Sequence, residues 1–214
     1  IYLNEFDQFM MKRNYRIVSD PDDILVLCSS KRSAEHALEV ATDFLEDTLD
    51  LTVNRDKTHI THSSAGVKFL GVEIYDTFTL IQEKKIKTFK VKVKSLTKRN
   101  QGMNLEMVIR RLNPVLRGFA NYFRIANCKG VLRDLMAWIR RRLRAIQLKL
   151  WKKPQRLNRR LRQLGHTGDF LLIKMSSWRN ASCVSSHLAM PNAWFKEIGL
   201  FLMADVKTGL IVPV

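Results

Sequence analysis

The fold of the first part of the chain is decided by residues 17–28, which have the sequence IVSDPDDILVLC. Two short apolar runs, at 15–18 and 24–28, stand on either side of a segment that holds Pro21 and several aspartates. Apolar runs of this length separated by Pro and Asp are typical of two strands joined by a tight turn. The sequence therefore predicts a β-hairpin whose tip is acidic.

The segments around this hairpin predict further helices and strands. Apolar residues on one side of 1–13 indicate the end of a helix, and Ser30 or Ser33 can cap a helix over 31–49. Short strands are expected at residues 51–53, 59–62, 67–75 and 78–81, the last two forming a hairpin around Asp76-Thr77. This part of the chain is therefore predicted to be α+β, with strands against a helix.

The second part is predicted to be helical. Apolar residues recur at helical spacing over 84–98, although the alternation of Lys and Val at 90–94 also fits a strand. Asn104 is expected to cap the next helix, and Asn113-Pro114 to mark a junction between helices. The clearest helix spans 132–150, where apolar residues recur at steps of three and four, and a loop-rich tail is expected after it, from Leu164.

Charge is distributed very unevenly along the chain. The 214 residues include 37 Lys and Arg and 20 Asp and Glu, which gives a net charge of +17. Residues 1–83 hold 8 basic and 15 acidic side chains, whereas residues 84–162 hold 25 basic side chains and two acids, Glu106 and Asp134. Binding of Lys and Arg side chains to phosphates releases counterions, which favours the complex. We therefore expect a nucleic-acid partner. A solvated basic surface and a membrane surface are the alternatives.

Several classes of protein do not fit the composition. Cys28, Cys128 and Cys183 stand singly, which argues against a disulfide framework and a zinc cluster. No apolar run approaches the ~18 residues of a membrane span, and the first residues do not resemble a signal peptide. We therefore expect a cytoplasmic or organellar protein that is not secreted, and the start at Ile1 suggests a fragment.

The hairpin tip is the candidate site for chemistry. Asp22 and Asp23 are adjacent carboxylates, which repel each other unless a cation neutralises them. Magnesium prefers oxygen ligands, and two-metal nucleotidyl transfer uses such carboxylates to brace the attacking and leaving oxygens. The alternative is an ordinary turn, because Asp favours turn geometry.

The order of the motifs resembles the C-terminal half of a group II intron-encoded reverse transcriptase/maturase. Residues 17–28 are similar to the polymerase hairpin usually written YADD, and residues 31–49 with 51–58 resemble the next palm motif. The other segments that carry the resemblance are 67–72 for the primer grip, 112–124, 138–144 and 150–153 for the thumb or maturase domain, and 175–179 with 192–195 for the tail. The resemblance implies a partial palm over 1–83, a helical thumb/maturase domain over 84–162, and a loop-rich maturase tail over 163–214.

The resemblance also implies the polymerase residues. Asp22 and Asp23 match the metal-binding hairpin, with Mg²⁺ as the cofactor of a completed site, and Lys57 matches a palm lysine near the incoming nucleotide. From the residues alone, Lys57 is equally well an exposed turn lysine. Asp20 and Pro21 depart from the family pattern, and the fingers and first catalytic aspartate are expected upstream of Ile1. We therefore expect that this chain does not polymerise by itself.

For the basic part, the resemblance implies binding of group II intron RNA. A DNA target or primer, and an N-terminal reverse-transcriptase segment or second chain, are further candidate partners; no membrane partner is expected. Basic and aromatic side chains together suit backbone contact and base stacking, although the aromatic ones also suit a helical core. The candidate RNA-binding residues are Arg117, Tyr122, Arg140, Arg141, Arg142, Arg144, Lys149, Trp151 and Lys152.

Overall fold

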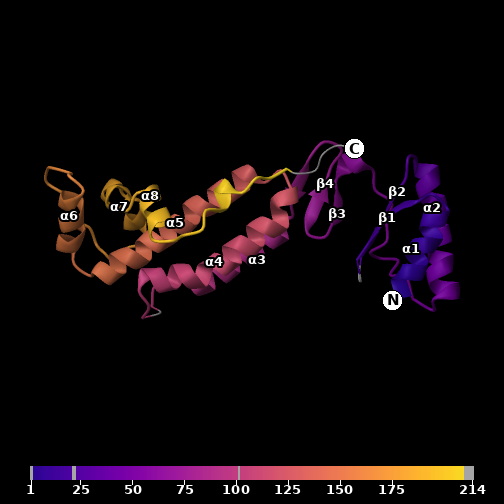
Figure 1. Cartoon of the computed structure of the whole chain (residues 1–214), viewed down its shortest axis with the longest axis horizontal. Helices are drawn as coiled ribbons and strands as arrows, with labels where there is room; N and C mark the ends of the chain where they lie inside the picture. Colours follow the sequence, from indigo (N-terminus) through magenta and orange to yellow (C-terminus); the bar gives the residue numbers. More distant parts are fainter. Residues whose placement is uncertain (1, 21–22, 101, 210–214) are drawn as a thin grey trace. The chain divides into compact units, whose positions relative to one another are not determined.

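The computed structural model describes residues 2–20, 23–100 and 102–209, and the chain divides into two compact units, Ile1–Thr77 and Phe78–Val214 (Figure 1). It is rich in helix and has two small antiparallel sheets, which confirms the predicted α+β class. Among the described residues, none of the helices combines the length and the apolar character that crossing a bilayer requires. The predicted boundaries at residues 83 and 162 stay a prediction.

The first unit is built around the predicted hairpin. Its elements are α1 (Tyr2–Lys12), β1 (Arg16–Ser19), β2 (Ile24–Leu27) and α2 (Lys31–Asp43), and α2 continues into a π-helical turn over Phe44–Thr48. The strands pair antiparallel, with Arg16 opposite Leu27 and Ser19 opposite Ile24, and the Ser30 hydroxyl caps α2 by accepting a hydrogen bond from the Ser33 N–H. The predictions of the hairpin and of both helices are confirmed.

A small apolar core joins these elements. Phe6 and Met10 of α1 are fully buried, and they pack with Ala41, Leu45 and Leu49 at the end of α2. The hairpin contributes Ile17 and Val26, which are opposite each other in the register and partly buried against this cluster. The two helices therefore support one face of the hairpin and position its tip.

The remaining strands differ from the prediction. Residues 51–53 and 59–62 form no strand; a 3₁₀ turn over Ser63–Ala65 follows them. The strand predicted over 67–75 is two strands, β3 (Val67–Phe69) and β4 (Val72–Ile74), which pair around Leu70 and Gly71. Both turn residues have positive φ, 47° and 83°, as a two-residue hairpin of type I′ requires. The continuous apolar pattern hid this turn because its first residue is a leucine.

The second unit is mostly helical. Its elements are β5 (Thr79–Ile81), α3 (Glu83–Leu96), α4 (Leu105–Tyr122), α5 (Lys129–Trp151), α6 (Pro154–Gln163), α7 (Val184–Ala189) and α8 (Asn192–Glu197). The apolar stripe of α5 is buried, including Leu132, Ile139 and Leu143, so the strongest predicted helix is confirmed. Residues 84–98 are predominantly helical, which rejects the strand alternative, and Asn104 caps α4 by accepting from the Met107 N–H.

The helix junction predicted at Asn113-Pro114 is wrong. α4 runs through both residues, although Pro114 removes one helical N–H donor. Leu112 and Leu116 are fully buried on either side, and the Asn113 side chain is bound to the C-terminal segment. Its Nδ2 donates to the Gly199 carbonyl (2.7 Å) and its Oδ1 accepts from the Phe201 N–H (2.9 Å). Burial and tertiary contacts on both sides of the proline support the continuous helix.

Candidate nucleic-acid interface

Of the predicted polymerase residues, Asp23 directly precedes β2 and Lys57 lies in the loop that follows α2 and its π-helical turn. Asp22 lies outside the described residues. Two backbone hydrogen bonds join the described residues at the ends of the strands, from the Asp20 N–H to the Asp23 carbonyl (2.8 Å) and from the Asp23 N–H to the Asp20 carbonyl (3.2 Å). Asp20 and Asp23 are both exposed, so their carboxylates are open to solvent.

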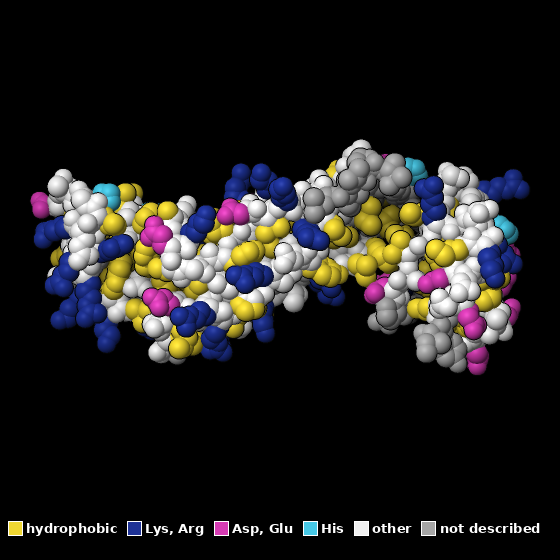
Figure 2. Space-filling model, in the orientation of Figure 1, with side chains coloured by type: hydrophobic (Ala, Val, Ile, Leu, Met, Phe, Trp, Pro, Cys, Tyr) yellow, Lys and Arg dark blue, Asp and Glu magenta, His cyan; other side chains and the backbone are white. Residues whose placement is uncertain are grey.

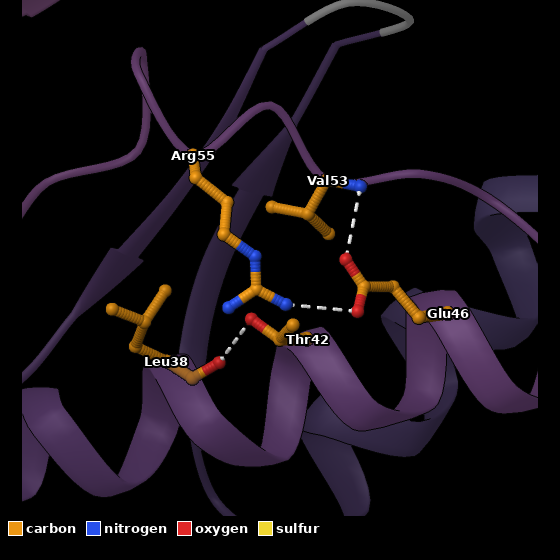
Figure 3. A network of polar contacts seen from close by, with 5 residues as sticks. All are labelled: Leu38, Thr42, Glu46, Val53 and Arg55. Carbon is orange, nitrogen blue, oxygen red and sulfur yellow. Dashed lines mark hydrogen bonds and ion pairs between the residues drawn. The ribbon is translucent and has the colours of Figure 1, made fainter.

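The loop that carries Lys57 is tied to α2 and its π-helical turn. Glu46 accepts hydrogen bonds from the Val53 N–H (3.4 Å) and from Arg55 Nη2 (3.0 Å), as Figure 3 shows. Asn54 then forms a turn, because its side-chain oxygen accepts from the Lys57 N–H (3.2 Å). Lys57 itself is exposed, and within the described residues no hydrogen bond or ion pair joins it to Asp20 or Asp23.

A magnesium site is not assembled by the described part of the chain. No three of its His, Cys, Asp and Glu side chains are grouped so that they could hold a metal ion. Of the two aspartates that match the metal-binding hairpin, the structure describes Asp23, whose exposed carboxylate does not by itself make up a two-metal centre.

The second unit presents a basic surface with few carboxylates. Figure 2 shows Lys and Arg side chains spread over the face of this unit that is drawn. Among its described residues, the ion pairs are Lys87 with Glu83 (2.9 Å) and Arg133 with Asp134 (3.7 Å). The lysines of α3 are all exposed, whereas Phe89 and Val93 of the same helix are buried. Most of the positive charge in this unit is therefore not neutralised by the protein.

The predicted RNA-binding residues outside the middle of α5 are mostly accessible. Arg117 is exposed on α4, with its guanidinium carbon 5.4 Å from the centre of the Phe201 ring, and Tyr122 is 57% exposed. Lys149 and Lys152 are exposed at the end of α5, where Trp151 is half-buried, and Lys149 Nζ donates to Asn100 Oδ1. These residues can reach a polyanion without a change of fold.

The four arginines of α5 that were predicted to bind RNA lie in different environments. Arg140 and Arg141 are half-buried, whereas Arg142 caps the end of α3 by donating to the Thr97 hydroxyl and to the Thr97 carbonyl (3.1 Å). Burial lowers the pKa of the Arg142 guanidinium, and the positive charge of Arg99 lowers it further. Arg142 therefore has a structural role besides any contact with RNA.

The position of Arg144 in the structure contradicts the prediction that this residue binds RNA. Its side chain is 2% exposed, because it lies under the C-terminal segment rather than toward solvent. Nε donates to the Met190 carbonyl (3.0 Å), Nη2 donates to Asn192 Oδ1 (3.0 Å), and the guanidinium carbon is 5.2 Å from the Phe195 ring centre. Burial, with the positive charge of Arg140, lowers the pKa of Arg144 to about 10. In this arrangement Arg144 holds the tail and does not present its charge to phosphate.

Two residues of the basic surface were missed in the sequence. These residues are Arg99, which follows α3, and Trp178, which lies in the tail. The guanidinium carbon of Arg99 is 5.6 Å from the centre of the Trp178 ring. Arg99 Nη1 also donates to the Ser176 carbonyl (2.6 Å). The sequence indicated an RNA-binding role for Trp178 only in that it is an aromatic residue in a basic chain. The spacing of Arg99 and Trp178 along the sequence did not indicate that the two side chains are in contact.

The lowered pKa of His187 predicts that the folded protein loses stability as the pH falls. Burial, with the positive charges of Arg144 and Arg140, lowers the pKa of this imidazole below its ordinary value of 6.5. At pH values between the folded-state pKa and 6.5, the unfolded chain therefore binds more protons than the folded chain. The contribution of His187 to stability is complete above pH 6.5 and is lost as the pH falls through the folded-state pKa. Urea unfolding from about pH 7 to about pH 5 should therefore show a smaller loss in the variant His187→Asn than in the parent. Parallel curves for the two proteins would contradict the assignment.

Two family models match the chain in succession. The model described as reverse transcriptase (RNA-dependent DNA polymerase) matches residues 1–74, which hold the β1–β2 hairpin and the Lys57 loop. The model described as group II intron, maturase-specific domain matches residues 86–165, which hold α3 to α6 and most of the basic side chains. A comparison with curated proteins gave no match.

Proposed function

Because the chain belongs to the group II intron-encoded reverse transcriptase/maturase family, whose two regions it carries in order, we propose that it binds folded group II intron RNA and assists splicing. The RNA supplies the splicing chemistry in this proposal, and the protein stabilises the folded form of the intron. A protein that binds only the folded RNA shifts the folding equilibrium by mass action.

The single observation that supports this proposal best is the unneutralised charge of the second unit. Residues 84–162 carry 25 basic and two acidic side chains, and only Lys87 and Arg133 are paired with carboxylates among the described residues of this unit. Phosphates can replace the missing counter-charges at many points along α3 to α6, with release of bound counterions. Exposed Tyr122 adds a ring on which an unpaired base can stack.

The polymerase activity of the family is proposed only for a completed site. Reverse transcriptases generally use Mg²⁺, and this chain offers Asp22, Asp23 and Lys57 toward such a centre. With the fingers and the remaining palm supplied as an N-terminal segment or second chain, primer extension on an RNA template is expected. Extension by the 214-residue chain alone would overturn this part of the proposal.

The test is RNA affinity as a function of salt. The full chain is titrated with a group II intron RNA and with an unrelated structured RNA of equal length, from low salt to about 200 mM. Preference for the intron RNA at about 150 mM salt, together with faster splicing when the protein is added, supports the maturase role. Equal and steeply salt-dependent binding to both RNAs would instead leave a general basic RNA- or DNA-binding module.

A further inference from the structure

Three arginines converge on one tryptophan in the second unit. The guanidinium carbons of Arg99, Arg141 and Arg142 lie 5.6, 5.9 and 5.1 Å from the centre of the Trp178 ring. We refer to these four residues as the Trp178 cluster. Its members come from the loop after α3, from α5 and from the tail, so only the folded unit assembles it. All four side chains are half-buried, which keeps the charges close together yet reachable from solvent.

The charges of the Trp178 cluster are not balanced by the protein. Within the described residues, no carboxylate forms an ion pair with any of the three arginines. Arg99 and Arg142 use some of their N–H groups on the Ser176 and Thr97 carbonyls. Arg141 makes no hydrogen bond in the described part of the chain, and its buried Nε lacks a partner. A buried donor without an acceptor costs free energy, as does the repulsion between neighbouring guanidinium groups.

An oxyanion bound at the accessible edge of the guanidinium groups would offset the repulsion between them. The face of a guanidinium can lie over an aromatic ring while its edge still donates N–H groups, and these groups match the oxygens of a phosphate. Lys149, further along α5, would extend the contact to a neighbouring phosphate, because its amine is exposed beside Asn100. A phosphodiester chain offers such oxygens at regular intervals, whereas an acidic peptide offers carboxylates on separate flexible side chains.

We propose that the Trp178 cluster binds a backbone phosphate of RNA, with Arg141 donating to it and Trp178 holding the three arginines in place. This inference rests on the proposed function, since it assigns one phosphate contact within the same RNA interface. The RNA-binding residues predicted from the sequence include Arg141 and Arg142 of this cluster, but not Arg99 or Trp178.

The test compares Arg141→Gln with a matched variant of the same helix. Arg141→Gln removes the charge of a side chain that makes no hydrogen bond in the described structure, so little structure should be lost with it. Arg133→Gln removes the same charge from an exposed arginine of α5 that is already paired with Asp134. Both full-length proteins are titrated with oligouridylate, a sequence-neutral single-stranded RNA, over a range of salt concentrations, and their folding is checked by circular dichroism.

We expect Arg141→Gln to bind oligouridylate about tenfold more weakly than the parent, with a salt slope smaller by about 0.7, as the loss of one single-strand phosphate contact predicts. Arg133→Gln should remain within about twofold of the parent. Equal affinities of the two variants would overturn the cluster assignment while leaving the proposed function intact. Failure of the parent to bind either oligouridylate or intron RNA would overturn the proposed function itself.

Tryptophan fluorescence provides a second measurement that does not depend on the folding of Arg141→Gln. The emission change on adding oligouridylate is compared between the parent and Trp178→Phe, which keeps an aromatic ring at this position. A change that is largely lost in Trp178→Phe places RNA at the cluster; a change that is fully retained would contradict the proposal. Poly-glutamate in place of RNA should give no comparable change, and tight binding of poly-glutamate would instead indicate an acidic-protein site.

Discussion

Replacement of Arg144 with alanine is expected to lower the free energy of unfolding by about 3 kcal/mol. The substitution removes two charge-assisted hydrogen bonds, to the Met190 carbonyl and to Asn192 Oδ1. It also leaves the Met190 carbonyl without this donor and opens space beside the fully buried Phe195. The C-terminal segment should then detach from α5 more readily, and urea unfolding with limited proteolysis of that segment measures both effects.

Arg140→Ala is the matched control for this prediction. Arg140 lies one helical turn before Arg144, is half-buried, and makes no hydrogen bond in the described part of the chain. Its removal should cost less than about 1 kcal/mol of stability, although it takes away the same formal charge. If both substitutions destabilise the protein equally, the hydrogen bonds to the tail are not what makes Arg144 important.

The simultaneous substitution of Lys84, Lys90, Lys94 and Lys98 by glutamine is expected to weaken binding of group II intron RNA roughly a hundredfold at about 150 mM salt. All four side chains are exposed, and the first three lie on α3. If each lysine neutralises one phosphate of single-stranded RNA, the slope of log affinity against log salt should fall by about 3. Filter binding or fluorescence anisotropy over a salt series measures the affinity and the slope together.

The same four positions substituted by arginine form the control, because that variant keeps the charge and the helix propensity of the parent. Its affinity should stay within a few-fold of the parent, and its salt slope should not change. A quadruple glutamine variant that binds as tightly as the parent would place the RNA on another face of the second unit. Thermal unfolding of both variants verifies that the helix is intact.

Much of the local structure is predictable from residues close together in sequence. The acidic hairpin follows from two apolar runs around Pro21, and α5 follows from an apolar stripe that is long enough for its period to be unambiguous. The Asn104 cap is equally local, since its side chain bonds an N–H three residues later. Where the pattern was short or ambiguous, as at residues 51–53, 59–62 and 67–75, the predicted strands were wrong or divided differently.

The candidate interface was predictable as a region but not residue by residue. A count of charges is enough to predict that residues 84–162 bind a polyanion, because net charge does not depend on how the chain folds. Four arginines within one and a half turns of α5 cannot all face the same way, yet the helix alone does not show which of them is covered. The covering segment comes from the tail, and the separation between Arg144 and Met190 is 46 residues.

The sequence alone thus determined the order of the motifs, the acidic hairpin and the basic helices. These features depend on composition and on contacts between residues close together in the chain. The tertiary structure alone decided that α4 continues through Pro114, that Arg144 is buried, and that Arg99 and Trp178 meet. Each of these outcomes depends on contacts between distant segments, such as the bond between Arg99 and Ser176, which are 77 residues apart. Burial of an arginine or retention of a proline in a helix is settled by the free energy of those contacts, which local propensity does not contain.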